Sequence, residues 1–263
     1  MSLRVFSRLY GRLTRIKHPR FLVRRVIHLF KSTYNIDMHT YQGEAEDYQC
    51  LVDFFIRPLD PSTRPLKQSL DHIVSPADGV LQTLETVSQD RATQVKGKYY
   101  PISELLLDEI DFSEEWHVAV IYLSPSDYHR FHYPVSGTLQ GFCHTGTRLY
   151  PVNAMGLSLV DRLFVKNERV SLRFDVAGHS MYAVAVGATF VGSIKINDIE
   201  LAKNDGLWKE LADEKPIQQL AEMGRFEMGS TIVLVIPKKM AQPLHDKLGK
   251  KLAVGEPIFT LNQ

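Results

Sequence analysis

Strand-like patterns dominate the chain from residue 73 onward. Apolar and β-branched residues cluster in four stretches, at 117–123, 171–178, 181–196 and 231–236. Runs of this length and composition are typical of buried β-strands. The stretch 73–87 predicts a strand, a turn built on Pro, Asp and Gly, and a second strand.

Helix-like patterns are fewer and lie mainly near the N-terminus. The stretch 39–59 predicts a helix that ends before Pro58, and shorter helical pieces are expected at 102–107 and 217–223. Ser124 followed by Pro125 predicts the start of another short helix, which Pro134 would end. We therefore expect an α+β fold with a mostly antiparallel β core and helices concentrated at the N-terminus.

The first 25 residues form a basic amphipathic pattern. At about 100° per residue, one helical stripe carries arginines and the neighbouring face is apolar; the residues are Arg4, Arg8, Arg12 and Arg15, beside Val5, Phe6, Leu9, Leu13 and Ile16. Gly11 weakens this helix and Pro19 bends or ends it. Such a helix fits either a membrane interface or the protein's own core, whereas nothing in the pattern supports nucleic-acid binding.

Composition narrows the class of protein without identifying it. With 263 residues, 44% of them hydrophobic, the chain can bury a large core in one domain with an N-terminal appendage. The two cysteines, Cys50 and Cys143, lack the spacing of a disulfide framework or a zinc site, which favours a reducing compartment. No apolar run is long enough to span a bilayer or to act as a secretory signal.

Three short motifs contain the candidate chemistry. They are "SPADG" at 75–79, "SPSDYHRFHYPVSG" at 124–137 and "EMGST" at 227–231. Each has a simple structural interpretation as a turn or a strand start. The second motif places His129 and His132 three residues apart, on one side of the expected helix, with Asp127 in the same turn. No further ligand follows at a diagnostic spacing, so no metal is expected.

In chain order the motifs supply a carboxylate, an imidazole and a hydroxyl, on Asp78, His132 and Ser230. A serine hydroxyl is a weak nucleophile until a nearby base takes its proton, and a carboxylate helps by fixing the tautomer of that base. Spacing alone leaves open whether the three groups meet. A membrane-associated serine hydrolase using them is the alternative interpretation, although the chain lacks G-x-S-x-G.

Five ordered motifs resemble those of the pyruvoyl-dependent phosphatidylserine decarboxylases of prokaryotic type. They are "SPADG", "YLSPSDYHRFHYPVSG", "LFVKNERV", "VGATFVGSI" and "EMGRFEMGST". The resemblance extends over most of the chain, from about residue 53 to the strand after "MGST". Met228 stands where the family usually has leucine, a substitution between flexible apolar residues that we expect to be tolerated.

The resemblance implies that Ser230 is converted into a cofactor. In the family, the serine hydroxyl attacks the carbonyl of the preceding glycine, here Gly229, and the chain is then cleaved to leave a covalent pyruvoyl group on the former serine. His132 is then expected to activate Ser230, with Asp78 orienting it, and His129 to serve the substrate. The pyruvoyl ketone would form a Schiff base with phosphatidylserine and accept electrons as CO2 departs, giving phosphatidylethanolamine.

The resemblance also suggests how the chain is organised. Residues 1–36 are expected to form a membrane-associating helical arm that binds an anionic surface. Residues 37–263 form the decarboxylase domain, cleaved between Gly229 and Ser230 into a large β chain and a small α chain. These fragments stay together as a heterodimer, and a further homodimer remains open. A lipid substrate favours peripheral attachment to the cytoplasmic side of the cell membrane.

Overall fold

The computed structural model describes residues 11–95, 97–188, 194–197, 199–201, 204–227 and 229–262. Its centre is an eight-stranded sheet. The strands, in spatial order, are β11 (Trp208–Ile217), β7 (Gly137–Thr145), β8 (Arg169–Val176), β9 (His179–Gly187), β13 (Ser230–Pro237), β5 (Trp116–Leu123), β2 (Gly79–Val87) and β15 (Lys251–Leu252). Neighbouring strands in this sheet are antiparallel, so the expected class of fold is confirmed.

Strand β13 lies in the interior of this sheet and is buried along its whole length. It pairs with β5 on one side and β9 on the other. Alternate side chains enter different hydrophobic clusters: Ile232 and Leu234 belong to one, and Val233 and Val235 to the other. Because both faces are covered, the strand is a continuous apolar run in the sequence.

Different elements cover the two faces of the large sheet. One cluster includes residues from two three-stranded sheets; these are β1 (His72–Val74), β16 (Pro257–Leu261) and β14 (Ala241–Pro243), and β10 (Ile194–Ile196), β12 (Glu222–Phe226) and β6 (Arg130–His132). The other cluster includes residues from the hairpin β3–β4 (Ala92–Val95, Lys98–Tyr100) and from helices α4 (Ile102–Leu106), α5 (Ala154–Leu159) and α6 (Leu163–Lys166). Short 3-10 turns η2 (Lys238–Met240) and η3 (His245–Lys247) join the last strands.

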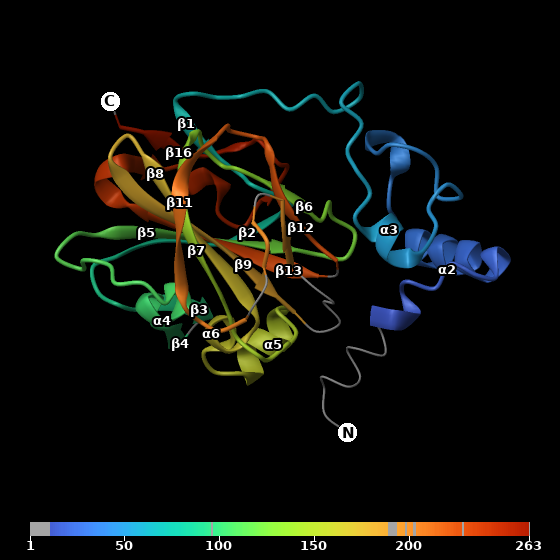
Figure 1. The fold of residues 1–263 in the computed structure, drawn as a ribbon, viewed down its shortest axis with the longest axis horizontal. Coiled ribbons are helices and arrows are strands. Elements are labelled where there is room, and N and C mark those ends of the chain that lie inside the picture. Colours follow the sequence, from blue (N-terminus) through green and yellow to red (C-terminus); the bar gives the residue numbers. More distant parts are fainter. Residues whose placement is uncertain are drawn as a thin grey trace.

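The N-terminal helical segment lies beside the end of the sheet where β6, β12 and β13 approach one another (Figure 1). It contains α2 (Arg20–Thr33), η1 (Met38–Thr40) and α3 (Leu51–Phe55), which enclose a hydrophobic cluster of their own. No helix in the described ranges is both long and apolar enough to cross a membrane. Residues 11–13 are helical and 14–19 are not, so the expected helix is already interrupted before Pro19, and α2 begins directly after that proline.

Three helix predictions are wrong in whole or in part. In 39–59, only α3 is an α-helix, because Gly43 adopts a φ of 74° and the Asp47 and Asp53 side chains accept backbone N–H groups in turns. In 217–223, Ile217 ends β11 and Leu220 has a φ of 68°, which a right-handed helix excludes. The helical piece at 102–107 is confirmed, and so are the predicted strands in their described residues, whereas 189–193 of the stretch 181–196 lie outside the described residues.

The helix expected after Ser124 is also absent from this fully described segment. The Asp127 carboxylate accepts the Ser124 N–H at 2.7 Å and closes a turn, after which β6 pairs with β12. His132 is the last residue of β6, and His129 directly precedes this strand. Residues three apart along an extended chain face opposite sides, so these histidines do not share a helical face.

Gly79, in the "SPADG" motif, is required by a close approach between β2 and β5. A Cβ atom there would lie 2.5 Å from the Tyr122 carbonyl oxygen and 2.9 Å from a methyl carbon of Ile121. We predict that Gly79→Ala lowers the free energy of unfolding by about 1–3 kcal/mol, as overpacking does in other cores. Chemical denaturation checks this.

The matched control is Gln82→Ala, which changes an exposed position of the same strand. It should change the free energy of unfolding by no more than about 0.5 kcal/mol. Equal stability of Gly79→Ala and wild type would show that the backbones of β2 and β5 separate without cost.

Candidate active site

Ser230 is the first residue of β13 and is fully buried. Its backbone is in register with Leu123 of β5 and Gly187 of β9. Its hydroxyl oxygen has no hydrogen-bond partner among the described residues. A buried hydroxyl without a partner is costly, and such groups in native structures call for a functional or structural explanation.

Gly229 precedes this serine and is surrounded by open space. A Cβ atom built on it would have no neighbour within 4 Å among the described residues. The backbone around the Gly229–Ser230 peptide bond is therefore uncrowded on the glycine side and fixed in the sheet on the serine side. Met228, the departure from the family's motif, lies outside the described residues, and so does much of "VGATFVGSI".

His129 is completely buried and uncharged. Its Nδ1 donates to the Asp127 carbonyl oxygen at 2.8 Å, which leaves the lone pair on Nε2. Nε2 has no partner within the described part of the chain. The ring lies against Phe55 of α3, with 3.9 Å between ring centroids. Burial in this apolar setting lowers the pKa of His129 to about 3.

His132 has both ring nitrogens engaged. Nδ1 donates to the Leu220 carbonyl oxygen at 2.8 Å, so Nε2 carries the lone pair and accepts from the Tyr128 hydroxyl at 3.0 Å. Burial lowers the pKa of His132, and it raises that of Tyr128, so both groups are neutral near pH 7. A backbone carbonyl rather than a carboxylate therefore fixes the tautomer of His132 in this structure.

Asp78 is held by partners that the sequence motifs did not indicate. Its two carboxylate oxygens accept from the Arg64 guanidinium at 2.7 and 2.5 Å, and Oδ1 also accepts the Val254 N–H at 2.8 Å. Burial lowers the pKa of His132, while the bond to the Leu220 carbonyl, the Glu222 carboxylate and the Asp78 carboxylate raise it by less. The "SPADG" turn also approaches His132 through its backbone, because the His132 N–H donates to the Pro76 carbonyl at 2.7 Å.

Asp127 is a second buried carboxylate at the site. Its Oδ2 accepts from the Ser124 N–H and hydroxyl, each at 2.7 Å, and its Oδ1 lies 2.8 Å from the Lys251 ammonium. Hydrogen bonding to this carboxylate raises the pKa of Lys251. Lys251 therefore stays protonated and neutralises the carboxylate.

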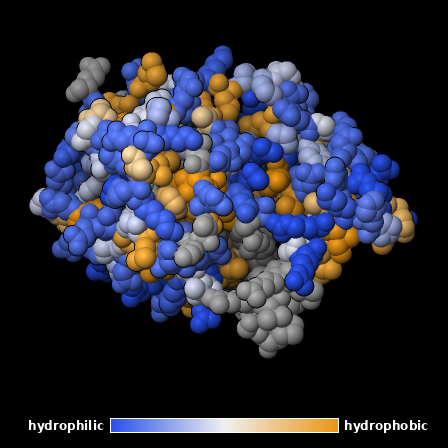
Figure 2. Space-filling model, in the orientation of Figure 1, coloured by the Kyte–Doolittle hydropathy of each residue, from blue (hydrophilic) through white to orange (hydrophobic). Residues whose placement is uncertain are grey.

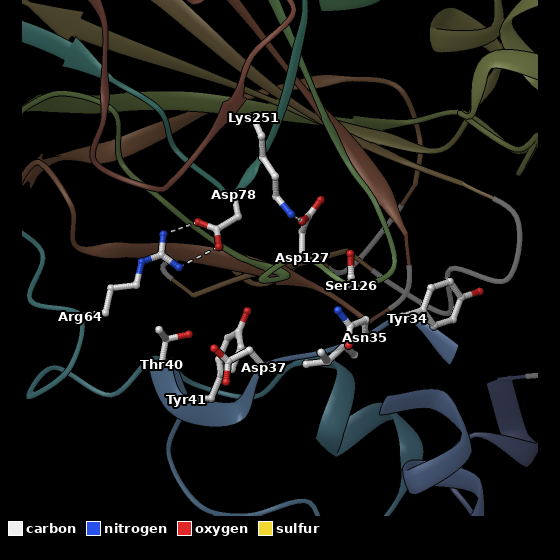
Figure 3. Close-up of a pocket in the computed structure, with 11 residues that line it drawn as sticks. Tyr34, Asn35, Asp37, Thr40, Tyr41, Arg64, Asp78, Ser126, Asp127 and Lys251 are labelled. Atoms are coloured by element: carbon white, nitrogen blue, oxygen red, sulfur yellow. Dashed lines mark hydrogen bonds and ion pairs between the residues drawn. The ribbon is translucent and has the colours of Figure 1, made fainter. Parts of the chain in front are cut away.

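A polar cavity of about 330 Å³ opens between the N-terminal segment and these turns. Figure 3 shows Arg64 and Asp78 facing each other on one side, with Lys251 directed at Asp127 above. The opposite wall comes from residues 34–41, including Tyr34, Asn35, Asp37, Thr40 and Tyr41. Two cations and their carboxylate partners thus line a cavity whose second wall is the N-terminal segment.

The structure brings some of the predicted residues together and leaves others apart. The "SPADG" turn that carries Asp78 bonds the His132 N–H through the Pro76 carbonyl, and the His129 carbonyl accepts the N–H of Phe226, three residues before Gly229, at 2.9 Å. No hydrogen bond joins Asp78 to His132, or His132 to Ser230, in these fully described residues. Sequence reasoning missed Arg64, which lies in a connection of unremarkable composition, and Tyr128, which stands inside the second motif.

Within the described residues, no cluster of three or more His, Cys, Asp and Glu side chains is arranged to hold a metal ion. Cys50 and Cys143 are both free and buried.

Comparison with known proteins places this arrangement in a family. A family profile described as phosphatidylserine decarboxylase matches residues 51–260, which extend from α3 into β16 and include all the site residues of the three motifs. The chain belongs to the phosphatidylserine decarboxylase family. The resemblance identified from the motifs is therefore confirmed.

Relatives of this chain in the phosphatidylserine decarboxylase family are similar to it over nearly their whole length. The phosphatidylserine decarboxylase proenzymes of Brevibacillus brevis and Marinobacter nauticus are each 35% identical, over 97% of this chain and 92% and 93% of theirs. That of Saccharophagus degradans is 36% identical, over 97% of this chain and 93% of its own. The similarity thus reaches beyond the profile into the N-terminal segment.

The neutral state of His129 makes stability depend on pH. Its folded pKa of about 3 lies below the value of about 6.5 expected in the unfolded chain. Between these values the unfolded state binds a proton that the native state excludes, so stability falls as pH is lowered below about 6.5. The test uses the uncleaved variant Ser230→Ala as the parent protein. Between pH 7 and pH 5, the free energy of unfolding should fall by about 2 kcal/mol less when His129→Gln is added to this parent.

Urea denaturation at the two pH values measures this difference. His132 is present in both proteins, so its own lowered pKa contributes equally to the pH dependence of the free energy of unfolding in each. An identical pH dependence in parent and variant would mean that His129 is protonated in the folded chain near pH 5.

Proposed function

We propose that this chain decarboxylates phosphatidylserine to phosphatidylethanolamine with a pyruvoyl group made from its own Ser230. Membership of the family supports the reaction. The observation that carries the self-processing step is the position of Ser230, whose hydroxyl is buried and unpartnered among the described residues directly after Gly229.

The proposed self-cleavage has three balanced stages. The Ser230 hydroxyl oxygen attacks the Gly229 carbonyl carbon, the C–N bond breaks, and an ester replaces the amide. Loss of the Ser230 Cα proton and of the ester oxygen from Cβ then leaves a carboxylate on Gly229 and a dehydroalanine on the new fragment. This dehydroalanine, an enamine, tautomerises to an imine, and water hydrolyses the imine, which releases ammonia and leaves the pyruvoyl group.

The residues around Ser230 fit a pyruvoyl group. Both flanking strands hold the backbone of Ser230, and no described side chain bonds to the hydroxyl that would be lost. When present, such a group supplies a ketone that binds a primary amine and accepts the electron pair released as CO2 leaves. Burial favours this chemistry because fixed dipoles act more strongly where water is excluded.

His132 is proposed as the base for self-cleavage. The Leu220 carbonyl holds its proton on Nδ1, so Nε2 is free to accept a proton. In the uncleaved state Nε2 accepts from Tyr128, and activation of Ser230 therefore requires that Nε2 exchange this partner or act through it. Asp78, close to His132 and paired with Arg64, would stabilise the imidazolium as it forms.

His129 is proposed to serve the substrate. Its Nε2 lone pair is buried without a described partner, so it can accept or return one proton without first breaking a hydrogen bond. Its low pKa keeps the ring neutral at working pH. The polar cavity is lined by Asp127, whose carbonyl bonds His129, and it offers Arg64 and Lys251 to the phosphate and carboxylate of a serine headgroup, and Asp78 and Asp127 to its ammonium.

Self-cleavage predicts two fragments, residues 1–229 and 230–263. The mass of the second should be lower than that of the unmodified peptide by one ammonia. Intact mass spectrometry of the purified protein checks this, and Ser230→Ala should stay full length and inactive. The hydroxyl has no described partner to lose, so Ser230→Ala should also remain folded. A wild-type chain that stays uncut under folding conditions would contradict the proposal.

Substitutions in the same assay separate the residues' roles. His132→Ala and Asp78→Asn should stay uncut, because the serine hydroxyl then lacks its base. His129→Ala should be cut and should react with hydroxylamine, yet turn over phosphatidylserine poorly. The assignment fails if His129→Ala stays uncut while His132→Ala matures.

The two fragments are proposed to remain together as a heterodimer. The smaller one begins with β13, which forms ladders with β5 and β9 over most of its length. It also supplies β16, which pairs with β1 of the larger fragment. Separating the fragments would expose the centre of the sheet.

Residues 1–36 are proposed to attach the protein to the cytoplasmic face of the cell membrane. Arg4 and Arg8 of the expected stripe lie outside the described residues, and Arg12 is exposed. Helix α2 adds exposed apolar side chains, and Figure 2 shows apolar surface at this end of the molecule; they are Phe21, Leu22, Val26 and Leu29. Apolar side chains interspersed with cations are what an anionic interface binds.

Removing two of these side chains should weaken binding to vesicles. Phe21 and Leu29 are 62% and 67% exposed. The double variant Phe21→Ser, Leu29→Ser should bind anionic vesicles about tenfold more weakly, because it loses apolar area that would enter the acyl region. Flotation with vesicles that contain phosphatidylglycerol measures this, and added salt should weaken the wild type as well.

The control replaces equally exposed leucines outside the arm, Leu70→Ser with Leu207→Ser, which are 76% and 65% exposed in wild type. Their replacement should leave flotation unchanged. Equal loss in both double variants would mean that α2 is not the attachment surface.

A further inference from the structure

The N-terminal segment touches the chain immediately before the proposed cleavage site. The Arg15 guanidinium forms an ion pair with the Glu227 carboxylate, and Glu227 precedes Gly229 by two residues. The Arg15 side chain is 44% exposed, whereas that of Glu227 is only 10% exposed. A carboxylate so little exposed is stabilised by charged or polar partners, and Arg15 supplies a cation.

The connection between β12 and β13 is short, and its ends are fixed in the β domain. At one end the Phe226 N–H donates to the His129 carbonyl at 2.9 Å, and at the other Ser230 is paired with both neighbours of β13. Glu227 is the only described residue between these points with a charged side chain. Its ion pair therefore links the connection to a different part of the chain.

Arg15 is itself held in place. Its Nη1 donates to the Gly11 carbonyl at 3.1 Å, and the Thr14 carbonyl beside it accepts the Val52 N–H at 3.1 Å, at the start of α3. One turn further, α3 contacts His129 through Phe55. The guanidinium thus reaches Glu227 from a turn that is already fixed to the helix packed on the site.

We propose that Arg15 is a positioning residue for self-cleavage, acting through Glu227 to hold the Gly229–Ser230 connection in the conformation that the serine attacks. The inference rests on the proposed self-cleavage. Attack within one residue needs the hydroxyl oxygen close to the carbonyl carbon, and small misplacements of reacting groups cost large factors in rate. The sequence pattern assigned Arg15 to a membrane-facing stripe, whereas in the structure it faces the protein.

The test follows maturation in time. Wild-type and variant full-length chains are synthesised by cell-free translation in a neutral detergent, which removes any contribution from anionic lipid, and a gel measures the half-time of cleavage. Arg15→Gln should lengthen this half-time by about tenfold or more, and Arg15→Lys, which keeps the charge, should restore part of the rate. Lys17→Gln removes a charge two residues away, from a side chain that bonds Gln49, and should mature like wild type.

A double-mutant cycle identifies the partner. Glu227→Gln should slow cleavage as well, and the combination with Arg15→Gln should be no slower than the slower single variant, because both changes break one interaction. Thermal unfolding of the same variants in a Ser230→Ala background reports on structure alone. A positioning role predicts that Arg15→Gln changes this Tm by no more than about 2 °C.

Several outcomes would overturn the inference, and they differ from failure of the proposed function. Equal half-times of Arg15→Gln and wild type would overturn it. A large fall in Tm without rescue by Arg15→Lys would assign Arg15 a structural role instead. Fully additive effects of the two variants would remove Glu227 as its partner. A wild-type chain that never cleaves would overturn the proposed self-processing, and this inference with it.

Discussion

The serine at the first position of an interior strand is held in place by the pairing of its backbone with both neighbouring strands, and its hydroxyl makes no hydrogen bond to the described residues. Ser230 is fixed between β5 and β9 and is fully buried, while its side chain has no described partner. The remaining site residues are arranged around this constraint. The turn after β5 contributes His129, the strand that follows contributes His132, and the "SPADG" turn that carries Asp78 bonds the His132 N–H through Pro76.

Much of this fold could be predicted from local pattern. Continuous apolar runs marked β5 and β13, because strands buried on both faces need apolar side chains at every position. The motifs also located Asp78, His129, His132 and Ser230, whose side chains we propose as the catalytic groups. Family membership was evident from the same motifs and is confirmed by the comparisons.

What local pattern could not predict are the long-range partners. Arg64 binds Asp78, and the Leu220 carbonyl fixes the tautomer of His132. Neither contact has a sequence signature, since a backbone carbonyl is available at every residue. The helix expected after Ser124 failed because a local Asp127 turn and pairing with β12 outweigh helix start signals. Tertiary pairing likewise overrides the helical period of 217–223.

The N-terminal segment contacts the proposed active site and also carries the proposed membrane-attachment surface. It forms one wall of the polar cavity, packs Phe55 on His129 and reaches Glu227 with Arg15, while the exposed side of α2 carries apolar side chains among basic ones. The segment proposed to bind a lipid surface thus also lines the cavity proposed to bind the lipid headgroup. This arrangement gives a physical reason for the similarity of the relatives to extend over 97% of the chain.

The most direct test of the central claim is chemical trapping of phosphatidylserine at Ser230. Purified protein is incubated with the lipid and sodium cyanoborohydride, digested, and examined by mass spectrometry. The account predicts that the lipid's amine becomes covalently attached to the first residue of the fragment 230–263, and that a fluorophosphonate probe does not label this position. Attachment elsewhere, or fluorophosphonate labelling of an intact Ser230, would contradict it.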